Sequence, residues 1–435
     1  MRVLELTDLY RPAIGGLERF VALLSQTLTQ RGHEVRVVTA AVAGEPRLER
    51  QGDVTVHRLP LTYQRLGLPL VADPARPFHP PARDPVFGRG LRQIVEDFHP
   101  DVIHAHSWSV HSALGRSLAV PVMVTAHDYG LACAKKSLVD LGGDACPGPS
   151  LRRCPTCAAG QYGTVKGAVL AVMSNTAMGR LRRVTTFTAV SDYVAGRLTP
   201  ILEPLTGRPV QTLHSFVPDG LFELGSASPA PDYLPTDPDD PSDRAHGEFL
   251  LYAGQLSTHK GIDVLLDAYQ RLSDTPAGAR PPLVLLGTTH PSFSTSQRLP
   301  AGVVVRTDVD HTEVMAAMVR AACVVVPSQW PEPLPMTVSE AHNCGVPTVA
   351  SNVGGIPEQM VDGVTGHLVP PGDPAALAAR LSDVLRSRRR AQAMGRAARR
   401  QGRMFTASYA IAEVERVLDE TVERHKASSL DLPAG

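Results

Sequence analysis

"RVLELTDLYRPAIGGLERFVALLSQTLTQRGHEVRVVTA", residues 2–40, decides the fold of the first part of the chain. The run at 2–7 predicts a buried strand, and 17–31 repeat apolar residues at helical spacing. Gly32 follows as a helix stop, and 34–40 predict the next strand. A strand, a glycine turn, a helix and a second strand in this order form one βαβ unit of a parallel sheet.

Strand and helix patterns continue along both halves of the chain. Further buried strands are predicted at 101–106, 121–127, 185–190 and 209–215. A second series is predicted at 248–254, 281–287, 302–307, 322–328 and 346–351, with helices at 261–272, 311–321 and 374–387. This alternation predicts an α/β chain of two doubly wound, Rossmann-like domains in tandem, with a ligand-binding crevice between them.

Composition excludes some classes of protein. The chain has 435 residues, too many for one ordinary core, and equal numbers of basic and acidic residues, 43 of each. A zero formal charge argues against a nucleic-acid partner held by a general positive field. Basic residues crowd at 386–403, which predicts a solvated helix face; the alternative is peripheral contact with an anionic membrane surface. We see no signal peptide and no apolar run of membrane-spanning length, and we expect a cytoplasmic protein.

One stretch marks the best domain boundary. Residues 222–246 are rich in Pro, Asp and Ser and have no periodic apolar face. We therefore predict an N-terminal domain at 1–218, a linker or loop at 219–247 and a C-terminal domain at 248–403. A last helix at 404–425 is expected to pack back on the N-terminal domain.

Two motifs suit phosphate groups. Gly15 and Gly16 lie between the first strand and a helix, where adjacent glycines let backbone N–H groups approach a phosphate closely. They do not form the G-x-G-x-x-G dinucleotide fingerprint, and a flexible turn is the alternative. Lys260, in "YAGQLSTHKG" (252–261), precedes a predicted helix, so its ammonium suits a diphosphate; the alternative is a surface lysine.

The stretch "PSQWPEPLPMTVSEAHNCG" (327–345) places one carboxylate before a helix and a second inside it. Pro335 fits the first turn of that helix and Gly345 its stop. Glu332 then lies in the preceding loop, and Glu340 lies about two turns in. Both are predicted to border one site at the helix N-terminus, where phosphate binds preferentially.

These residues together resemble the family 4 glycosyltransferases of the GT-B fold. The resemblance rests on "PAIGGLERFVALLSQTLTQRGHEVRVVT", "DVIHAH", "TAHD", "GQLSTHKG" and "EPLPMTVSEAHNCGVPTVASNVGGIPEQMVDGVTGHLV", and it continues to "MGRAARRQGRMFTASYAIAEV" (394–414). It implies a retaining enzyme of hexosyltransferase type that uses a nucleoside-diphosphate sugar and requires no cofactor for catalysis. The acceptor would be a glycan, a lipid-linked carrier or a small molecule.

The resemblance also implies roles for individual residues. Glu340 would accept hydrogen bonds from the ribose hydroxyls, and Glu332 would face the donor sugar. The diphosphate would meet Lys260 and backbone N–H groups of the helix start, those of Leu334, Met336 and Thr337.

His127, in "TAHD", corresponds to the active-site histidine of the family and would orient the sugar or stabilise charge on the leaving diphosphate. His104 and His106 resemble a family pattern too, but we interpret them as lying on alternate faces of a predicted strand, and we expect only one to face the crevice. Gln255 stands where the family usually has Arg, so one diphosphate-binding cation is missing.

Four of the six cysteines lie in "CAKKSLVDLGGDACPGPSLRRCPTC" (133–157), which we interpret as an insertion in the N-terminal domain. The four are Cys133, Cys146, Cys154 and Cys157. One C-x-x-C knuckle with two further thiols predicts a structural zinc site; the alternatives are a redox-sensitive disulfide and unligated thiols. The other two, Cys323 and Cys344, are expected in the core.

Two other activities stay open at this stage. A sugar-nucleotide epimerase or phosphorylase has the same two-domain fold, and the acidic pair together with "THKG" favours transfer over either. A catalytically inert sugar-nucleotide-binding protein is the other alternative. Gln255 favours that hypothesis, whereas the intact His127, Lys260, Glu332 and Glu340 oppose it.

Overall fold

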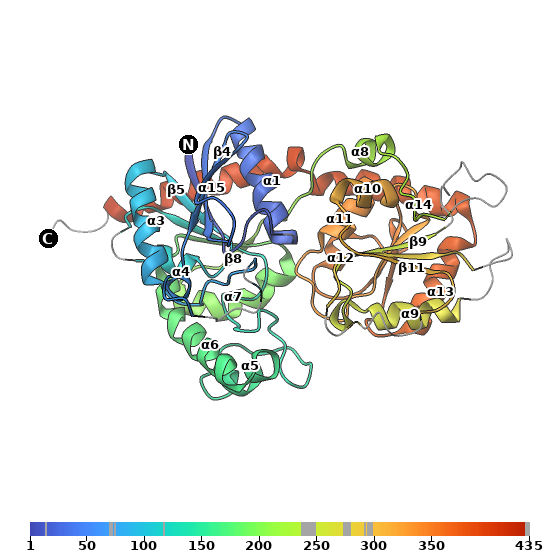
Figure 1. Ribbon diagram of the computed structural model, residues 1–435, viewed down its shortest axis with the longest axis horizontal. Helices are drawn as coiled ribbons and strands as arrows, with labels where there is room; N and C mark the ends of the chain where they lie inside the picture. The colour runs from blue at the N-terminus through green and yellow to red at the C-terminus, as the bar shows by residue number, and fades with distance from the viewer. Residues whose placement is uncertain are drawn as a thin grey trace. The chain divides into compact units, whose positions relative to one another are not determined.

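The computed structural model describes residues 1–13, 15–68, 73, 75–115, 118–235, 249–272, 280–290, 293 and 299–430. The chain divides into two compact units. Unit 1 consists of Met1–Ser215 with Ala410–Gly435, and unit 2 is Phe216–Tyr409. Each unit has a largely or wholly parallel sheet with helices beside it, so the predicted α/β class is confirmed (Figure 1).

The sheet of unit 1 has the strand order β3-β4-β2-β1-β5-β6-β7-β8. Every pair is parallel except the β3–β4 hairpin. The bounds are β1 Arg2–Leu6, β2 Glu34–Ala40, β3 Leu48–Gln51, β4 Val54–Leu59, β5 Val102–Ala105, β6 Val122–Ala126, β7 Thr186–Ala189 and β8 Val210–Thr212. Strands that helices cover on both faces are rich in apolar residues, and the strands predicted for this unit are confirmed, whereas β3 and β4 were not predicted.

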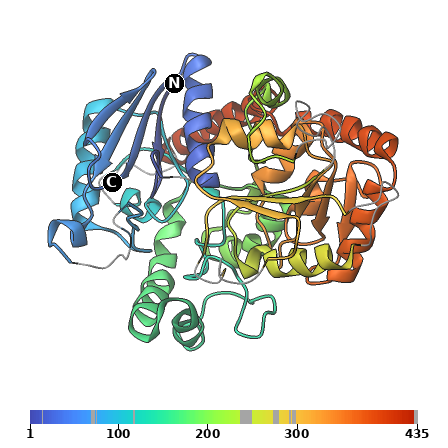
Figure 2. The same cartoon turned by 45° about the vertical axis from the view of Figure 1, so that its right-hand side comes forward.

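The helices of unit 1 connect these strands, except for α15, which arrives after unit 2. Their bounds are α1 Gly16–Gln30, α2 Thr62–Arg65, α3 Pro85–Phe98, α4 Val110–Ala113, α5 Cys154–Tyr162, α6 Thr164–Ala177, α7 Asp192–Thr206 and α15 Ala407–Leu430, with a 3₁₀ segment at Met178–Arg183. α5 and α6 form a hairpin that extends away from the sheet in both views (Figures 1 and 2). From Ala410 onward α15 belongs to unit 1, where Thr421 donates a hydrogen bond to Thr186.

Among the described residues, unit 2 has a six-stranded sheet in the order β11-β10-β9-β12-β13-β14, and all pairs in it are parallel. The strands are β9 Leu250–Ala253, β10 Leu283–Leu286, β11 Val303–Arg306, β12 Cys323–Val326, β13 Thr348–Ser351 and β14 Gly366–Val369. The helices are α8 Leu221–Ala227, α9 Ile262–Arg271, α10 His311–Met318, α11 Met336–Asn343, α12 Ile356–Gln359, α13 Pro374–Leu385 and α14 Arg388–Gly402, with 3₁₀ segments at Thr258–Lys260 and Arg403–Phe405. No helix among the described residues combines the length and the apolar character needed to cross a bilayer.

Each sheet reverses its strand order once. In unit 1 the chain builds outward from β1 through β2 to β4 and then returns to the other edge of β1 with β5. In unit 2 it builds from β9 through β10 to β11 and returns to β9 with β12. At such a reversal the two following loops diverge beyond the carboxyl ends of the strands, which is where ligands bind in open α/β sheets.

One predicted boundary requires correction. We predicted a linker or loop over 219–247, but 221–227 form α8, which belongs to unit 2. Leu221 is buried, and Gly225 packs so closely on α10 that a Cβ there would lie 2.5 Å from the carbonyl oxygen of Met315. The helix is too short, and its contact residue too small, to give an apolar period. Residues 236–247 lie outside the described residues.

Gly287, which follows β10, gives a test of this fold. Its φ is +145°, and a Cβ there would lie 1.8 Å from the carbonyl oxygen of Gly254, so Gly287→Ala is expected to destabilise the protein by about 3 kcal/mol. Gly363→Ala is the matched control, because its φ is +75° but no atom lies within 4 Å; we expect a loss of about 1 kcal/mol. Urea denaturation measures both, and equal losses would contradict the close approach.

Candidate active site

A buried carboxylate and a lysine meet beyond the carboxyl ends of β9 and β12. Lys260 ends the 3₁₀ turn after β9, and Glu332 lies in the loop after β12. The Lys260 Nζ lies 2.6 Å from Glu332 Oε1, and the Ser328 hydroxyl donates to the same oxygen at 2.6 Å. The Glu332 residue is only 3% exposed, so these two donors offset the cost of burying its charge.

Glycines allow the loops around this pair to approach one another. Gly261, directly after Lys260, has φ +77°, and a Cβ there would lie 1.8 Å from the Pro327 carbonyl oxygen. Gly354 has φ +62°, and its Cβ would lie 2.1 Å from the Glu332 carbonyl oxygen, which accepts a hydrogen bond from the Gly355 N–H at 2.7 Å. Larger residues at these positions would separate the loops that hold the ion pair.

Glu340 has a different partner. It is the fifth residue of α11, little more than one turn in rather than the two turns predicted, because α11 begins at Met336 after Pro335. Its carboxylate is buried, and Oε1 lies 3.0 Å from His311 Nε2 at the start of α10. The structure therefore joins Glu332 to Lys260 and Glu340 to His311, all within unit 2.

The remaining predicted residues of unit 2 lie around the start of α11. Leu334 is buried, while Met336 and Thr337 are half-buried and open the first turn, where N–H groups have no acceptor inside a helix. The Thr337 hydroxyl donates to the Ala253 carbonyl at 3.2 Å, which connects α11 to the end of β9. Gln255 follows β9, and its carbonyl accepts a hydrogen bond from the Tyr252 hydroxyl at 2.6 Å.

In unit 1 two histidines contact one buried carboxylate, and a third histidine contacts one of them. Glu5 in β1 lies between His104 in β5 and His106 just beyond it, with His106 Nε2 2.6 Å and His104 Nδ1 3.2 Å from Glu5 Oε2. His127, after β6, follows in series, its Nε2 3.0 Å from His106 Nδ1. Our expectation that His104 and His106 lie on different faces is wrong, because residues two positions apart in an extended segment point to the same side, and both rings contact Glu5.

The hydrogen bonds from Glu5 to His127 determine which ring nitrogens of His106 and His127 carry a proton. Burial by itself would raise the pKa of Glu5, but the charge and hydrogen bonds of His104 and His106 lower it to about 2. Burial, and then the charge of His104, lowers the pKa of His106 to about 4. A neutral His106 that donates through Nε2 to Glu5 must accept at Nδ1, so His127 donates through Nε2 and keeps Nδ1 as an acceptor.

The Glu5, His104 and His106 side chains also lie close enough together to suggest a metal centre. Their nitrogens, however, already have protein partners. His104 Nε2 lies 2.7 Å from the Thr125 hydroxyl, and both nitrogens of His106 are used by Glu5 and His127. We therefore describe this group as a hydrogen-bonded relay.

Gly15 and Gly16 lie at the start of α1, with Gly15 as the N-cap residue. The Glu18 carboxylate covers this helix start, because a Cβ on Gly15 would lie 2.1 Å from its Oε2. Arg76 approaches the same carboxylate at 3.5 Å. An anionic side chain of the protein thus lies against the predicted phosphate-binding turn.

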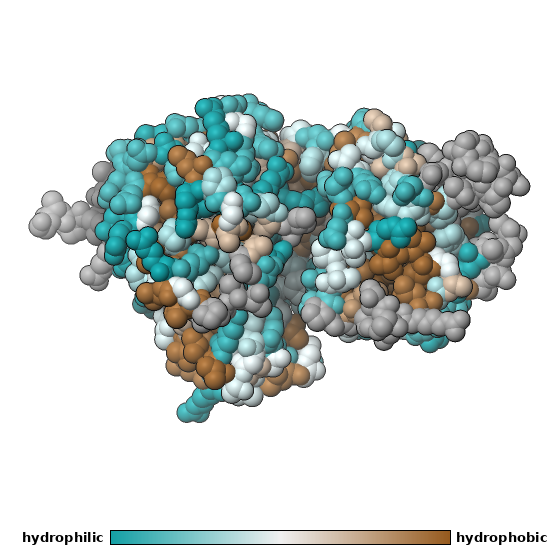
Figure 3. Space-filling model, in the orientation of Figure 1, coloured by the Kyte–Doolittle hydropathy of each residue, from teal (hydrophilic) through white to brown (hydrophobic). Residues whose placement is uncertain are grey.

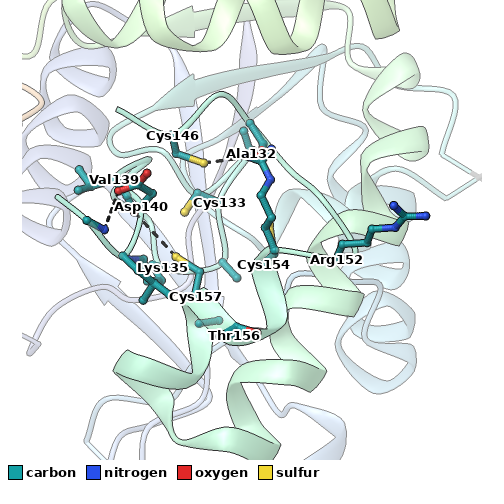
Figure 4. Close-up of a pocket in the computed structure, with 16 residues that line it drawn as sticks. Ala132, Cys133, Lys135, Val139, Asp140, Cys146, Arg152, Cys154, Thr156 and Cys157 are labelled. Carbon is teal, nitrogen blue, oxygen red and sulfur yellow. Dashed lines mark hydrogen bonds between the residues drawn. The ribbon is translucent and has the colours of Figure 1, made fainter. Parts of the chain in front are cut away.

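The four clustered cysteines line one cavity of about 380 Å³ in unit 1, together with residues of the loop before α5 (Figure 4). All four are free thiols and half-buried. The Cys146 and Cys157 thiols donate weakly to the carbonyls of Gly148 and Val139. Among the described residues, no three thiols lie within 4.8 Å of one another, so a four-sulfur shell is not formed in this arrangement and zinc stays a prediction. Cys323 and Cys344 are buried, as expected.

Comparisons with known proteins identify the class of this chain. Residues 14–217 match the family model "Glycosyltransferase Family 4", and 237–401 match "Glycosyl transferases group 1". Glycogen synthase of Mycobacterium tuberculosis is 26% identical, covering 92% of this chain and 90% of its own. D-inositol 3-phosphate glycosyltransferase of Frankia alni is 29% identical, covering 88% of this chain and 90% of its own.

Solved structures share the fold. Sucrose-phosphate synthase from Thermosynechococcus elongatus superposes with a TM-score of 0.71 at 19% identity, covering 97% of this chain and 99% of its own. HepE of Anabaena in complex with UDP-glucose gives a TM-score of 0.62 at 16% identity, covering 97% of this chain and all of its own. The chain is a glycosyltransferase of the GT-B fold.

Three residues that contact the predicted site residues of this glycosyltransferase were not predicted from the sequence: Glu5, His311 and Ser328. Glu5 had a signal, because a lone carboxylate inside an apolar strand requires buried partners. Ser328 and His311 had none, since one is a common loop residue and the other lies 29 residues before Glu340.

The relay predicts how stability of the glycosyltransferase depends on pH. The pKa of His106 in the folded protein, about 4, is below its ordinary value of 6.5. Between these two pH values the unfolded chain therefore binds a proton at His106 that the folded protein does not bind. The contribution of neutral His106 to the free energy of unfolding is fully present above about pH 6.5 and is lost as the pH falls toward 4. Ionised Glu5 makes a second contribution, which is lost between about pH 4.5 and 2. His106→Asn should flatten the loss between about pH 7 and 4 by roughly 1–3 kcal/mol in denaturant titrations. His99→Asn, at an exposed site, is the control and should leave the slope unchanged.

The zinc prediction has a direct test. Elemental analysis of the glycosyltransferase purified without chelators should find about one zinc per chain, and Cys154→Ser with Cys157→Ser should abolish it. Cys323→Ala, outside the cluster, should leave the zinc content unchanged. A folded, metal-free chain whose clustered thiols react with a thiol reagent would refute the prediction.

Proposed function

We propose that this glycosyltransferase moves a sugar from a nucleoside-diphosphate sugar to an acceptor hydroxyl with retention of anomeric configuration. The observation that carries the proposal is the Lys260–Glu332 ion pair beyond the carboxyl ends of β9 and β12, beside the start of α11. A cation and a helix N-terminus suit a diphosphate, and a buried carboxylate beside them suits sugar hydroxyls. Relatives of this fold have been solved with UDP-glucose and with ADP, which supports a donor of this class.

The donor would use three parts of unit 2. Its diphosphate would bind Lys260 and the N–H groups of Met336 and Thr337, while the hydroxyls of its ribose would donate to Glu340. His311 holds the Glu340 carboxylate at 3.0 Å and would keep it oriented toward the ribose. Gln255 supplies no charge, so Lys260 carries the cationic contact among the proposed residues.

The departing group requires the strongest stabilisation. As the bond between the anomeric carbon and the diphosphate oxygen breaks, its electron pair moves to the diphosphate, where Lys260 and the start of α11 meet the growing negative charge. Glu332 would stabilise the positive charge that develops on the sugar ring. The acceptor oxygen then bonds to the same face of that carbon and passes its proton to the departing phosphate oxygen, which gives retention.

His127 supplies the contribution of unit 1. With its Nε2 proton held by His106, its Nδ1 is an acceptor suited to a donor-sugar hydroxyl. Burial, followed by the charges of His106 and His104, holds its pKa well below the ordinary value, so the ring is neutral near pH 7. We assign His127 the role of orienting the sugar. The acceptor classes that fit are a glycan, a lipid-linked carrier and a small molecule.

The roles of the two carboxylates can be separated. Glu340→Ala should weaken nucleotide binding about tenfold, because a buried charged hydrogen-bond acceptor is lost. Glu332→Ala should lower turnover about 100-fold with little change in nucleotide affinity. Thermal shift with UDP-, GDP- and ADP-sugars identifies the donor and its affinity, product release measures turnover, and NMR of the product reports its anomeric configuration.

The control is Asp267→Ala, which removes a half-buried carboxylate of α9 that pairs with Arg271 in the same unit; its nucleotide affinity and turnover should match those of the wild type. Equal effects of Glu332→Ala and Glu340→Ala on affinity and on turnover would contradict the assigned roles. Absence of stabilisation by any nucleotide sugar or bare nucleoside diphosphate would overturn the proposal itself, and an inverted product would overturn retention.

A further inference from the structure

Glu5 is a charged residue in the middle of an apolar strand. Hydrophilic residues, drawn in teal, cover much of the face shown in the space-filling view (Figure 3), and glutamate is normally found at the surface. Glu5 is instead wholly inaccessible, between the buried Leu4 and Leu6 in the central strand β1. An apolar residue there would pack without needing any partner, so stability alone gives no reason for a carboxylate at this position.

Two histidines hold the Glu5 carboxylate in place. His104 Nδ1 lies 3.2 Å from Glu5 Oε2, and the ring centre of His104 is 4.1 Å from that of His106. The Thr125 hydroxyl lies 2.7 Å from His104 Nε2, so both nitrogens of His104 have partners. The shortest contact is that of His106 Nε2, 2.6 Å from Oε2. An ionised carboxylate can only accept a hydrogen bond, so His106 must be the donor.

The direction of this hydrogen bond sets the direction of the next one. His106 has a pKa of about 4 and is neutral near pH 7, so its single ring proton is the one on Nε2. Its Nδ1 therefore accepts from His127 Nε2, 3.0 Å away. Within the part of the chain that the structure describes, His127 Nδ1 has no hydrogen-bond partner. The relay thus ends at a ring nitrogen that can only accept.

Phe20 of α1 packs beside both of the later rings. Its ring centre lies 5.0 Å from that of His127 and 6.3 Å from that of His106, and the residue is buried. An apolar ring in this place excludes water that would offer either imidazole a competing partner. The tautomer of His127 is therefore set by Glu5, through His106.

The tautomer matters for a sugar, because a hydroxyl can either donate or accept. A hydroxyl that donates to His127 Nδ1 gains electron density on its oxygen, which stabilises positive charge on the neighbouring ring. A hydroxyl that accepts from a protonated Nδ1 loses electron density and opposes that charge. The difference is greatest in the transition state, so it affects kcat more than donor binding.

We propose that Glu5 and His106 are positioning residues for glycosyl transfer, which hold His127 in the tautomer whose Nδ1 accepts from a donor-sugar hydroxyl. The inference rests on the proposed function, since the contact between His127 and the donor sugar is taken from there. It adds two buried residues that act only through His127. A buried carboxylate can affect catalysis in this way without meeting the reacting atoms.

Single substitutions interrupt the relay at two points. Glu5→Gln keeps the shape of the side chain but removes its charge, and an amide can turn either its oxygen or its nitrogen toward His106. His106→Gln keeps a donor for Glu5 but removes the acceptor for His127. Each should lower kcat about tenfold and change the KM for the donor less than about twofold.

A double-mutant cycle separates this role from a structural one. The two substitutions are repeated in a His127→Asn background, where the shorter side chain ends near the position of the histidine Nδ1 and does not reach His106. His127→Asn should itself lower kcat, and adding Glu5→Gln or His106→Gln should lower it no further. The matched control is Asp84→Asn, which turns another buried carboxylate of unit 1, the N-cap of α3, into an amide; its kcat should match that of the wild type.

Nitrogen NMR of isotope-labelled histidine reads the tautomer without any substrate. The signals of His127 are identified by their loss in His127→Asn. In the wild type His127 should carry its proton on Nε2, and in Glu5→Gln it should show a mixture of both tautomers. Urea unfolding of every variant establishes that kcat and the spectra are measured on folded protein.

The outcomes distinguish this inference from the proposed function. Losses of kcat that add in full in the His127→Asn background overturn the inference alone, because Glu5 and His106 then act independently of His127. A proton on His127 Nδ1 in the wild type, or an unchanged tautomer in Glu5→Gln, overturns it whatever the activity. Wild-type turnover by His127→Asn overturns the role assigned to His127 and the inference with it. Absence of turnover with every nucleotide sugar overturns the proposed function, on which the NMR result does not depend.

Discussion

In each unit the order of the strands in the parallel sheet reverses at one central strand, and the position of the polar groups depends on that strand. These strands are β1 and β9. The next strand in the sequence pairs with one edge of each, and a later strand, β5 or β12, pairs with the other edge. The loops on their two sides must therefore part at the carboxyl end. Glu5 and the three histidines gather around β1, and Lys260 and Glu332 lie beyond β9.

The cost of burying a charged carboxylate then determines which side chains lie together beyond β1 and β9. Glu5 and Glu332 are both almost inaccessible, and an ionised carboxylate without partners is too costly to bury. Each receives its partners from a different part of the chain. Glu5 is held by His104 and His106, about 100 residues later in the sequence, and Glu332 by Lys260, 72 residues earlier. Each polar group is therefore complete only when the strands that carry its members have paired.

The sequence carries much of this information, but unevenly. Parallel strands read as apolar runs, so the strands around β1 and β9 were predictable. β3, β4 and β14 were not predicted, because "LERQ", "VTVHRL" and "GHLV" are not continuous apolar runs. Lys260, Glu332 and Glu340 were predicted from their motifs, and His127 from the family resemblance of "TAHD". Their partners His311 and Ser328 depend on tertiary packing, and no local pattern indicates such a contact. The α8 helix was missed because a glycine makes its main contact.

The last helix makes unit 1 discontinuous in the chain. Met1–Ser215 are joined by Ala410–Gly435 only after the whole of unit 2. The Thr421 hydroxyl, fully buried, reaches Thr186, and Glu415 binds Arg31 and His33. During synthesis on the ribosome, unit 1 must wait for its final element while unit 2 emerges and folds. The surface that α15 later covers is exposed throughout that interval, so translation that stops early would release an unfinished first unit beside a complete second one.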